Sequence, residues 1–426
     1  MLYLIKKLIP KKLLSLIMPP YHFCMALLAA LRYGFPSRKI NVVAITGTKG
    51  KTTTTELVNA FLEEAGHTTA LASTLRFKIA DYSERNMLKM TMPGRFFLQK
   101  FLREAVKKGC KYAIIEMSSE GARQFRHRFI EIDAVIVTNL SPEHIESHGS
   151  FEKYREAKLS IARQLEHSKK QKTTLVANKD DAECAPFFDI TSTEKYGYSL
   201  KAVDSYSLGK EGIDIVIEGK KVHSYLPGIF NVYNIIAAMT YAQTQNISLS
   251  EIIDALKKFK GVRGRMERVY VTSPTLRKLQ NFEVIVDYAH TTDSLEKAYR
   301  VFEGKNKICV LGGTGGGRDK SKRVKMGEIA AKYCKEIILT NEDPYDEDPQ
   351  SILLDIAKGI RNKKIHIVLD RREAIRKAFS GAKKSDVVLI TGKGTDPYIM
   401  DKGGVKIPWD DADVSREELE KVLLAR

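Results

Sequence analysis

The stretch TGTKGKTT, residues 46–53, joins the apolar run NVVAIT (residues 41–46) to the helical pattern ELVNAFLEEAG (residues 56–66). A short, continuous apolar run is typical of a strand buried in a parallel sheet. A strand, a glycine-bearing loop and a helix in that order form a unit whose helix N-terminus binds phosphate groups. The stretch therefore predicts a nucleotide-binding domain of the α/β class.

Each part of this loop has a chemical use. Its glycines let backbone amides close around phosphate oxygens, the lysine brings a positive charge to the β and γ phosphates, and a threonine hydroxyl can bind magnesium. The early glycine of the full GxxxxGK[ST] pattern is missing, because Ile45 occupies that position. The alternative is an ordinary glycine turn, which the strand before and the helix after disfavour. The predicted nucleotide-binding residues of the loop are Gly47, Thr48, Gly50, Lys51, Thr52 and Thr53.

The same alternation of strands and helices continues beyond the loop. KYAIIEMSS (residues 111–119) and DAVIVTNL (133–140) read as strands, and FEKYREAKLSIARQL (151–165) reads as a helix. We therefore expect a first large domain, residues 39–262, with a mainly parallel sheet of the P-loop ATPase type.

A hinge and a second α/β domain follow. The glycine-bearing phrase GVRGRMERV, residues 261–269, reads as the hinge, and residues 263–426 are expected to form a Rossmann-like domain with its own parallel sheet. Its predicted strands are FEVIVDYAH (282–290), KNKICVLGG (305–313), EIILTN (336–341), KIHIVLD (364–370) and DVVLITGKG (386–394).

The first 38 residues form a basic, apolar arm that is poor in acids. No residue from Leu13 to Leu31 carries a full charge, but Pro19 and Pro20 would break a helix that spans a membrane. Two interpretations stay open. The arm is either a pair of short helices packed on the next domain, or a segment that lies on an anionic membrane surface. The first predicts contacts from Met25, Leu28 and Ala29, which lie at helical spacing.

The formal charge of +18, from 70 Lys and Arg against 52 Asp and Glu, favours a polyanionic partner such as a nucleotide or an anionic membrane. No run interleaves basic with aromatic residues, so we expect no nucleic-acid partner. The five cysteines form no CxxC pair. Neither a zinc ribbon nor a disulfide framework is indicated, and a reducing, cytoplasmic location is expected.

Glu116 ends the predicted strand KYAIIE and would emerge at the carboxyl edge of the sheet, beside the phosphate loop. Ligands bind at that edge in open α/β folds, so Glu116 is a natural magnesium ligand. His144 and Lys158 follow further along the chain. Taken alone, His144 is as readily explained as a structural histidine, and Lys158 as a solvated lysine.

Eight motifs in order resemble the Mur ligase family, and within it the MurE branch, which adds the third amino acid of the peptidoglycan stem. The resemblance runs from about Asn41 to Tyr398. It implies a cytoplasmic ATP-dependent ligase of peptidoglycan biosynthesis, which joins an amino acid to a muropeptide acceptor through an acyl phosphate. The motifs are TGTKGKTTT, EMSSEGARQ, TNLSPEHIESHGSFEKYREAK, LPGIFNVYN, GRMERV, VDYAHTTDSL, GGTGGGRDKSKR and GKG.

The resemblance also implies roles for individual residues. Lys51 and Thr52 would hold the triphosphate and a first magnesium ion, and Glu116 would complete that metal site. His144 would help hold a second magnesium ion, and Lys158 would be carbamylated, which converts a cation into an anion beside the metals. The metal ligands implied in this way are Thr52, Glu116, His144 and Lys158.

Three further positions match family residues. Asn234 would lie near the adenine, Asp287 would bind the ribose, and Arg265 would lie at the hinge. The family resemblance implies that the last domain closes to bring the amine onto the acyl phosphate while water is excluded. The catalytic residues implied are Lys51, His144, Lys158 and Arg265.

The chain departs from the family pattern in the amino-acid site. Where diaminopimelate-adding relatives have the arginine of DNPR, this chain has Tyr345, and their GKGHE is replaced by GKGTD, which ends in Asp396. With Asp343 also present and no distal arginine, the site favours a diamino acid with one carboxylate, such as lysine or ornithine. The predicted substrate-binding residues are Arg318, Asp343, Tyr345, Gly392 and Asp396.

The acceptor is the second departure. Members of this branch carry an N-terminal domain that grips the UDP end of the substrate, whereas about forty residues precede this phosphate loop. The acceptor is therefore UDP-linked, lipid-linked or free. Two other readings stay open, a ligase like folylpolyglutamate synthetase and a non-enzymatic ATP-binding scaffold. GKTT and VDYAHT favour the Mur branch over the first, and the retained lysines and Glu116 argue against the second.

Overall fold

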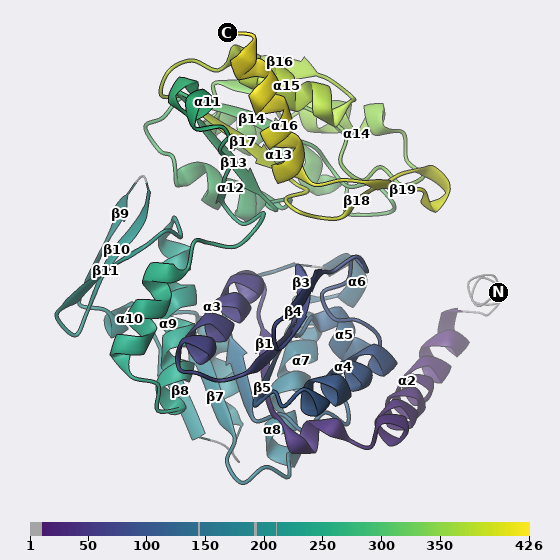
Figure 1. Cartoon of the computed structure of the whole chain (residues 1–426). Helices are drawn as coiled ribbons and strands as arrows, with labels where there is room; N and C mark the ends of the chain where they lie inside the picture. The colour runs from purple at the N-terminus through teal and green to yellow at the C-terminus, as the bar shows by residue number, and fades with distance from the viewer. Residues whose placement is uncertain (1–10, 144, 191–193, 210) are drawn as a thin grey trace. The chain divides into compact units, whose positions relative to one another are not determined.

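The computed structural model describes residues 11–143, 145–190, 194–209 and 211–426. The chain divides into two compact units, both of the predicted α/β class (Figure 1). Unit 1 comprises Met1–Ser207, Asp214–Ser224 and Ile229–Phe259, and unit 2 comprises Leu208–Ile213, Tyr225–Gly228 and Lys260–Arg426.

Unit 1 is built on an eight-stranded sheet whose central strands are parallel, as the sequence predicted. One edge is antiparallel, because β3 and β4 fold back as a hairpin beside β2. In spatial order the strands are β4 (Tyr82–Arg85), β3 (Arg76–Ile79), β2 (Thr69–Ala72), β5 (Tyr112–Glu116), β1 (Asn41–Thr46), β6 (Ala134–Val137), β7 (Thr174–Asn178) and β8 (Glu194–Tyr198).

The helices of unit 1 pack in two groups. Helix α3 contacts α9 and α10, whereas α4 contacts α2 and α5 contacts α7. Side chains of α4 and α7 join those of β1, β5 and β6 in one apolar core. The helices are α2 (Lys11–Tyr33), η1 (Pro36–Lys39), α3 (Lys51–Glu64), α4 (Arg95–Lys107), α5 (Ser119–Arg123), α6 (Ile145–His148), α7 (Phe151–Ala162), α8 (Gln164–His167), η2 (Ala182–Asp189), η3 (Leu200–Ala202), α9 (Ile229–Thr244) and α10 (Leu249–Lys258).

A small three-stranded sheet follows β8 in the chain. Its middle strand, β10, is mostly buried, whereas β9 is exposed along its whole length. They are β11 (Lys220–Ser224), β10 (Gly212–Ile217) and β9 (Ser205–Gly209).

Unit 2 contains a six-stranded sheet that is parallel except for the short edge strand β12. Helix α15 packs on β14, β15 and β17 and contacts α16, while α13 contacts α12 and α14. In spatial order the strands are β12 (Glu267–Arg268), β13 (Glu283–Asp287), β17 (Val387–Thr391), β14 (Lys307–Leu311), β15 (Glu336–Leu339) and β16 (Lys364–Ile367). The helices are α11 (Pro274–Leu279), α12 (Thr292–Arg300), α13 (Ser321–Tyr333), α14 (Pro349–Ala357), α15 (Arg371–Gly381), η4 (Lys402–Gly404) and α16 (Asp411–Leu424).

An antiparallel hairpin, β18 (Tyr398–Met400) and β19 (Lys406–Pro408), extends from the carboxyl side of β17. The sequence analysis did not predict it, because each strand is very short. Backbone bonds tie the hairpin to the loop after β15, since the N–H of Tyr345 donates to the Met400 carbonyl.

A disulfide joins Cys309 on β14 to Cys334 at the end of α13. The prediction that the cysteines form no disulfide was wrong. The two residues are 25 positions apart and carry no CxxC signal. The two cysteines meet because the chain crosses over from β14 through α13 to β15. This crossover brings the end of α13 back next to β14.

The arm contains one continuous helix, α2, where a pair of short helices was expected, and Pro19 and Pro20 lie inside it. Each proline removes one backbone donor, yet the chain stays helical on both sides. No helix of the described residues is long and apolar enough to cross a membrane.

Alanines pack α2 against α4 within unit 1. Ala26, Ala29 and Ala30 are buried, and short side chains let the helix approach α4 closely. The expected contact of Ala29 is therefore confirmed, and Met25 is half-buried. The expected contact of Leu28 is wrong, since this side chain is 53% exposed on the outward side of the helix.

Candidate active site

The glycine loop lies between β1 and α3, where the sequence placed it, and its two glycines have positive φ angles of 141° at Gly47 and 82° at Gly50. A Cβ atom at Gly47 would lie 1.9 Å from Thr138 Oγ1, and one at Gly50 would lie 2.3 Å from Asn234 Oδ1. No other residue type fits these two places. The bare backbone leaves the amides at the start of α3 accessible to phosphate oxygens.

Lys51 folds back over this loop. Its Nζ donates to the carbonyl oxygens of Gly47 at 3.1 Å and Thr48 at 3.0 Å. Thr48 is itself fixed, because its hydroxyl lies 2.9 Å from the hydroxyl of Tyr154 on α7. The loop therefore presents a lysine ammonium beside its backbone amides, which is the arrangement that binds a triphosphate.

Glu116 ends β5, and the parallel register aligns it with Ile45 on β1, so its carboxylate emerges beside the loop. Both carboxylate oxygens lie 3.1 Å from the hydroxyl of Thr52, and Thr74 donates its N–H and its hydroxyl at 2.9 Å. The carboxylate is buried, and no cationic side chain of the described residues pairs with it. A buried carboxylate next to a threonine hydroxyl is an oxygen-ligand set suited to magnesium.

Lys158 reaches the same loop from α7. Its side chain is completely buried and its Nζ donates to the Gly47 carbonyl at 2.7 Å. Burial lowers the pKa of Lys158 well below its usual range, and the neighbouring ammonium of Lys51 lowers this pKa further. No carboxylate of the described residues forms an ion pair with Lys158. Two lysines thus share one backbone carbonyl at the loop.

His144, the predicted ligand of a second magnesium ion, lies outside the described residues. The next histidine, His148 on α6, is buried, with its Nε2 3.1 Å from Ser119 Oγ and 3.4 Å from a Glu120 carboxylate oxygen. Among the residues that the structure describes, no three His, Cys, Asp or Glu side chains gather as a metal cluster.

Thr53 and Asn234 lie near the loop on α3 and α9. Thr53 is buried. The Asn234 amide donates to Asn231 Oδ1 at 2.8 Å and accepts a bond of 3.4 Å from Thr54 Oγ1. Asn234 is therefore held against Gly50 by neighbours on two helices.

In unit 2, Asp287 ends β13. Its two carboxylate oxygens accept the N–H groups of Met266 at 2.7 Å and Ala289 at 2.8 Å, which ties the predicted hinge to this strand. The Arg265 guanidinium lies 4.4 Å from the centre of the Tyr288 ring. Asp287 and Arg265 are thus adjacent at the carboxyl edge of the sheet.

The predicted amino-acid site also lies at this edge of unit 2, and it contains a residue that the sequence analysis missed. The fully buried Lys393 places its ammonium 2.8 Å from Asp343 and 2.9 Å from Asp396. Asp343 also accepts the N–H of Met400 at 2.8 Å. The GKG string was the sequence signal for Lys393, because a lysine between two glycines indicates a special backbone conformation. In the structure both glycines have positive φ angles. The Lys393 ammonium is therefore a cationic partner for both Asp343 and Asp396.

Tyr345 and the loop after β14 complete this site. Tyr345 has a φ of 52°, and a Cβ at Gly316 would lie 2.8 Å from its ring. Burial raises the pKa of Tyr345, Asp343 raises this pKa further, and Arg318 lowers it, so all three side chains are neighbours. At Gly392 a Cβ would lie 2.4 Å from a Glu342 carboxylate oxygen. The five predicted substrate-binding residues are thus brought together.

Comparison with known proteins agrees with this geometry. The family profile described as Mur ligase middle domain matches residues 45–242, and the profile described as Mur ligase, glutamate ligase domain matches residues 264–394. A relative from Syntrophomonas wolfei, named UDP-N-acetylmuramoyl-L-alanyl-D-glutamate--2,6-diaminopimelate ligase, is 35% identical over 94% of this chain and 82% of its own length. The chain belongs to the Mur ligase family. The predicted family and fold class are confirmed, and the chain is an ATP-dependent ligase.

Two further Mur ligases cover most of the chain. A relative from Roseiflexus sp., named UDP-N-acetylmuramyl-tripeptide synthetase, is 34% identical over 95% of this chain and 83% of its own length. A solved structure of a UDP-N-acetylmuramoyl-L-alanyl-D-glutamate--2,6-diaminopimelate ligase is 29% identical, with a TM-score of 0.60, and covers 90% of this chain and 78% of its own. The Mur ligase profiles include the glycine-bearing stretches at residues 46–53, 312–317 and 392–394.

Proposed function

We propose that this Mur ligase joins a diamino acid to the carboxylate of a peptidoglycan-precursor peptide in the cytoplasm, at the expense of ATP. A carboxylate oxygen attacks the γ phosphorus and ADP leaves. The amine then attacks the acyl carbon, phosphate leaves, and the amine loses a proton. The observation that carries the proposal is the meeting of Lys51, Lys158 and Glu116 around the bare backbone of the glycine loop.

Unit 1 supplies the charge stabilisation for the first step. The amides at the start of α3 and the Lys51 ammonium hold the phosphates, Asn234 lies by the adenine, and Thr52 and Glu116 are the described residues that fit magnesium. Two magnesium ions, one of them also bound by His144, would supply positive charge that offsets the charge on the phosphates. The buried carboxylate of Glu116 supports this assignment, since a carboxylate without a cationic partner is costly in a protein interior.

We further propose that Lys158 is carbamylated. Its amine adds to carbon dioxide, one proton is released, and the product is an anion beside Lys51. Two ammonium groups at one carbonyl repel each other, whereas an ammonium and a carbamate attract. Lys158→Arg should therefore lose ligation, while added bicarbonate should stimulate the wild type after carbon dioxide is removed. Lys153→Arg, at an exposed position of the same helix, is the control. Full activity of Lys158→Arg would contradict the carbamate.

For the amino-acid substrate we propose a diamino acid with a single carboxylate, such as lysine or ornithine. Arg318 pairs with the α-carboxylate, while Asp343 and Asp396 attract the distal ammonium. Lys393 lies between the two acids and offsets part of their negative charge. Gly392 keeps the backbone close to this site, and Tyr345 stands where an arginine would bind a second carboxylate. Asp287 is assigned to the ribose and Arg265 to the hinge between domains 39–262 and 263–426.

The acceptor is proposed to be the UDP-linked dipeptide named in the relatives, or a lipid-linked or free form of it. A screen of these acceptors with lysine, ornithine and meso-diaminopimelate, scored by phosphate release, tests the whole assignment. Phosphate release that needs both a muropeptide and an amino acid supports it. Release with a folate and glutamate would favour the folylpolyglutamate alternative, and ATP binding without release would favour a scaffold.

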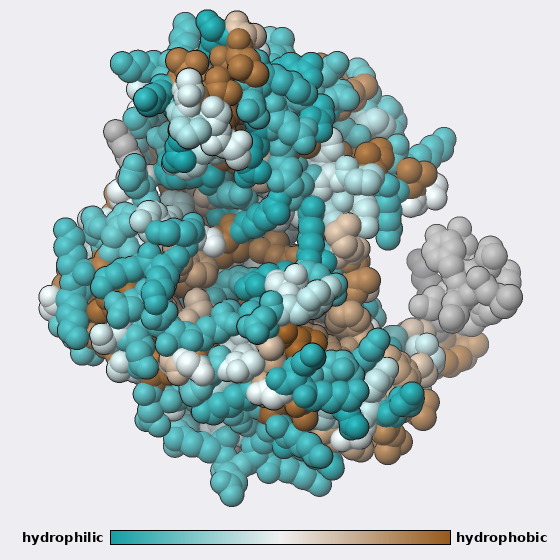
Figure 2. Space-filling view, in the orientation of Figure 1, coloured by the Kyte–Doolittle hydropathy of each residue, from teal (hydrophilic) through white to brown (hydrophobic). Residues whose placement is uncertain are grey.

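We also propose that α2 contacts an anionic membrane surface. Five large apolar residues at helical spacing point outward, with 47% to 72% of each side chain exposed, and Figure 2 shows apolar atoms along this helix. Residues 1–40 contain no Asp or Glu, so the arm is purely cationic. An apolar face with basic neighbours is the pattern of a helix that lies in a lipid interface. The five residues are Leu13, Leu16, Ile17, Leu28 and Leu31.

A further inference from the structure

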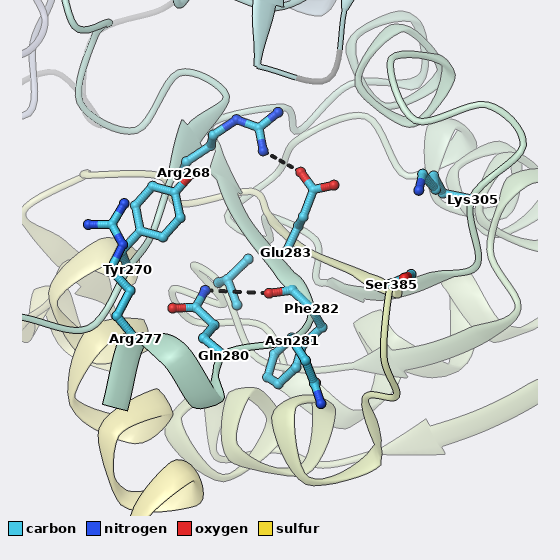
Figure 3. A pocket seen from close by; sticks show the side chains of 10 residues that line it. Arg268, Tyr270, Arg277, Gln280, Asn281, Phe282, Glu283, Lys305 and Ser385 are labelled. Atoms are coloured by element: carbon cyan, nitrogen blue, oxygen red, sulfur yellow. Dashed lines mark hydrogen bonds and ion pairs between the residues drawn. The ribbon is translucent and has the colours of Figure 1, made fainter. Parts of the chain in front are cut away.

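A cavity of about 390 Å³ opens at the amino end of β13 and β17 in unit 2 (Figure 3). Glu283 begins β13 and lines the cavity, whereas Asp287, at the far end of the same strand, lies in the candidate active site. Five strand residues span roughly 13 to 17 Å, so the cavity is separate from the amino-acid site. Nothing in the proposed ligation uses it.

The lining of this cavity is strongly cationic. Arg268, Arg277 and Lys305 contribute three positive charges and Glu283 contributes one negative charge, which leaves a net charge of +2. Only Arg268 is paired, with Glu283. The Arg277 guanidinium lies 4.0 Å from the centre of the Tyr270 ring, and among the described residues neither Arg277 nor Lys305 has an ion-pair partner. Two cations thus remain for an anion.

Two buried polar atoms in the lining also lack a hydrogen bond within the described part of the chain. They are Arg268 Nη2, a donor, and Gln280 Oε1, an acceptor. The Gln280 amide nitrogen is held by the carbonyls of Val269 at 3.1 Å and Phe282 at 3.4 Å, so the side chain cannot turn freely to satisfy its oxygen. Buried polar groups are almost always hydrogen-bonded, so the walls of this cavity contain a donor and an acceptor whose hydrogen bonds are not made within the described residues.

The remaining lining combines the apolar side chains of Phe282 and Val284 and the ring of Tyr270 with the uncharged polar side chains of Asn281 and Ser385. Phe282 and Val284 line the cavity and are themselves buried, and the Tyr270 ring lies beside Arg277 (Figure 3). A cavity of this size accommodates a small metabolite. Apolar side chains beside cations suit a molecule with an anionic group and an uncharged body.

We propose that this cavity is a second ligand site, which binds a small organic anion bearing a phosphate or carboxylate group. Arg268 Nη2, Arg277 and Lys305 bind the anionic group by charge-assisted hydrogen bonds, and Gln280 Oε1 accepts a bond from the body of the ligand. The site is independent of ATP and of the amino acid.

Inorganic phosphate and acetate are the probes, titrated by calorimetry into the full chain at constant ionic strength. All proteins carry Lys51→Ala, so that the glycine loop contributes no phosphate binding. The double variant Arg277→Gln with Lys305→Gln should weaken binding about tenfold, because two charge-assisted contacts are lost. Lys278→Gln with Lys335→Gln, which removes the same charge from positions outside the cavity lining, should leave binding unchanged.

The two anions distinguish the ligand's charged group, since the tighter probe identifies phosphate or carboxylate. Equal weakening in the cavity and control variants would overturn the proposal, because it would show a general attraction to a basic surface. Absence of binding by both probes would overturn it as well. Neither result bears on the ligation, which depends on Lys51 and on the other edge of the sheet.

Discussion

Lys51 and Lys158 donate to the same Gly47 carbonyl although they come from different helices, 107 positions apart in the sequence. The local pattern around the loop predicted Lys51, because strand, loop and helix are contiguous. The role of Lys158 was predicted only from the family resemblance, since the neighbouring sequence does not distinguish a buried lysine on a helix from an exposed one. Lys393 was missed although it stands in the GKG string, because its pairing with Asp343 spans 50 positions of the sequence.

Removing either charge at the loop should abolish ligation. In Lys51→Ala the γ phosphate loses its ammonium, and in Glu116→Ala the carboxylate beside Thr52 is lost. Both changes remove charge stabilisation from phosphoryl transfer, so turnover should fall by at least about a hundredfold, which corresponds to about 3 kcal/mol. Phosphate release is the measurement and Lys107→Ala, at an exposed pair on α4, is the control. Normal turnover in either loop variant would contradict the assignment.

The amino-acid preference should follow the charge at position 345. We expect the wild type to use lysine or ornithine with a higher kcat/KM than meso-diaminopimelate, because a second carboxylate near Asp343 and Asp396 meets repulsion. Tyr345→Arg should shift the preference towards meso-diaminopimelate by supplying a partner for that carboxylate. Tyr196→Arg, on the surface of unit 1, is the control. A wild-type preference for meso-diaminopimelate would refute this specificity and leave the ligase intact.

Buried His127 should make the stability of unit 1 depend on pH. Burial lowers the pKa of His127 to about 3, against 6.5 for an unperturbed histidine. Between these values the unfolded chain binds a proton that the folded chain does not, so stability rises with pH from about 3 to 6.5 and then levels off. The expected slope is about 1.4 kcal/mol per pH unit. Denaturant unfolding of His127→Gln between pH 4 and 6 should show a slope smaller by this amount, and equal slopes would exclude His127.

At the scale of elements, many of the central strands were predicted from contiguous apolar patterns, whereas β2, β7 and the helix α4 were not predicted. β1, β5, β6, β13, β14, β15, β16 and β17 all lie within the runs read from the sequence. The β3–β4 edge and the β18–β19 hairpin were not predicted, because short polar strands depend on their neighbours for pairing. The sequence analysis also did not predict that α2 continues through two prolines. Packing against α4 outweighs the helix-breaking tendency of these prolines.

The junction of loop and α3 offers a prediction about one element. Gly50→Ala places a methyl group 2.3 Å from Asn234 Oδ1, whereas Gly66→Ala, just after the same helix, meets no atom within 4 Å. Both glycines have positive φ, so the backbone strain of each change should cost about 1 kcal/mol of stability, and Gly50→Ala should cost more because of its close contact with Asn234. Only Gly50→Ala should weaken ATP binding, by about tenfold, in a calorimetric titration. Equal ATP affinity of the two variants would show that the close approach at Gly50 is not required.

At the scale of the whole molecule, the arm should determine where the enzyme is found. Leu16→Glu with Leu31→Glu inserts two charges into the outward stripe of α2 and should reduce co-sedimentation with vesicles of anionic lipid. Leu354→Glu, at a position on α14 that is 48% exposed, should not. ATP affinity should be the same in all three proteins. Unchanged vesicle binding of the α2 variant would exclude the membrane, and self-association lost in that variant alone would identify a second copy as the partner.

The rate at which the disulfide of unit 2 is reduced also measures how often that unit opens. Cys309 and Cys334 are 0% and 1% exposed, so a reductant such as dithiothreitol can reach the sulfur atoms only when the segment around β14 and α13 opens. The rate of reduction therefore reports how often this region opens, without any label. A ligand that binds unit 2 slows reduction in proportion to its stabilisation of the closed form, whereas a ligand confined to unit 1 leaves the rate unchanged.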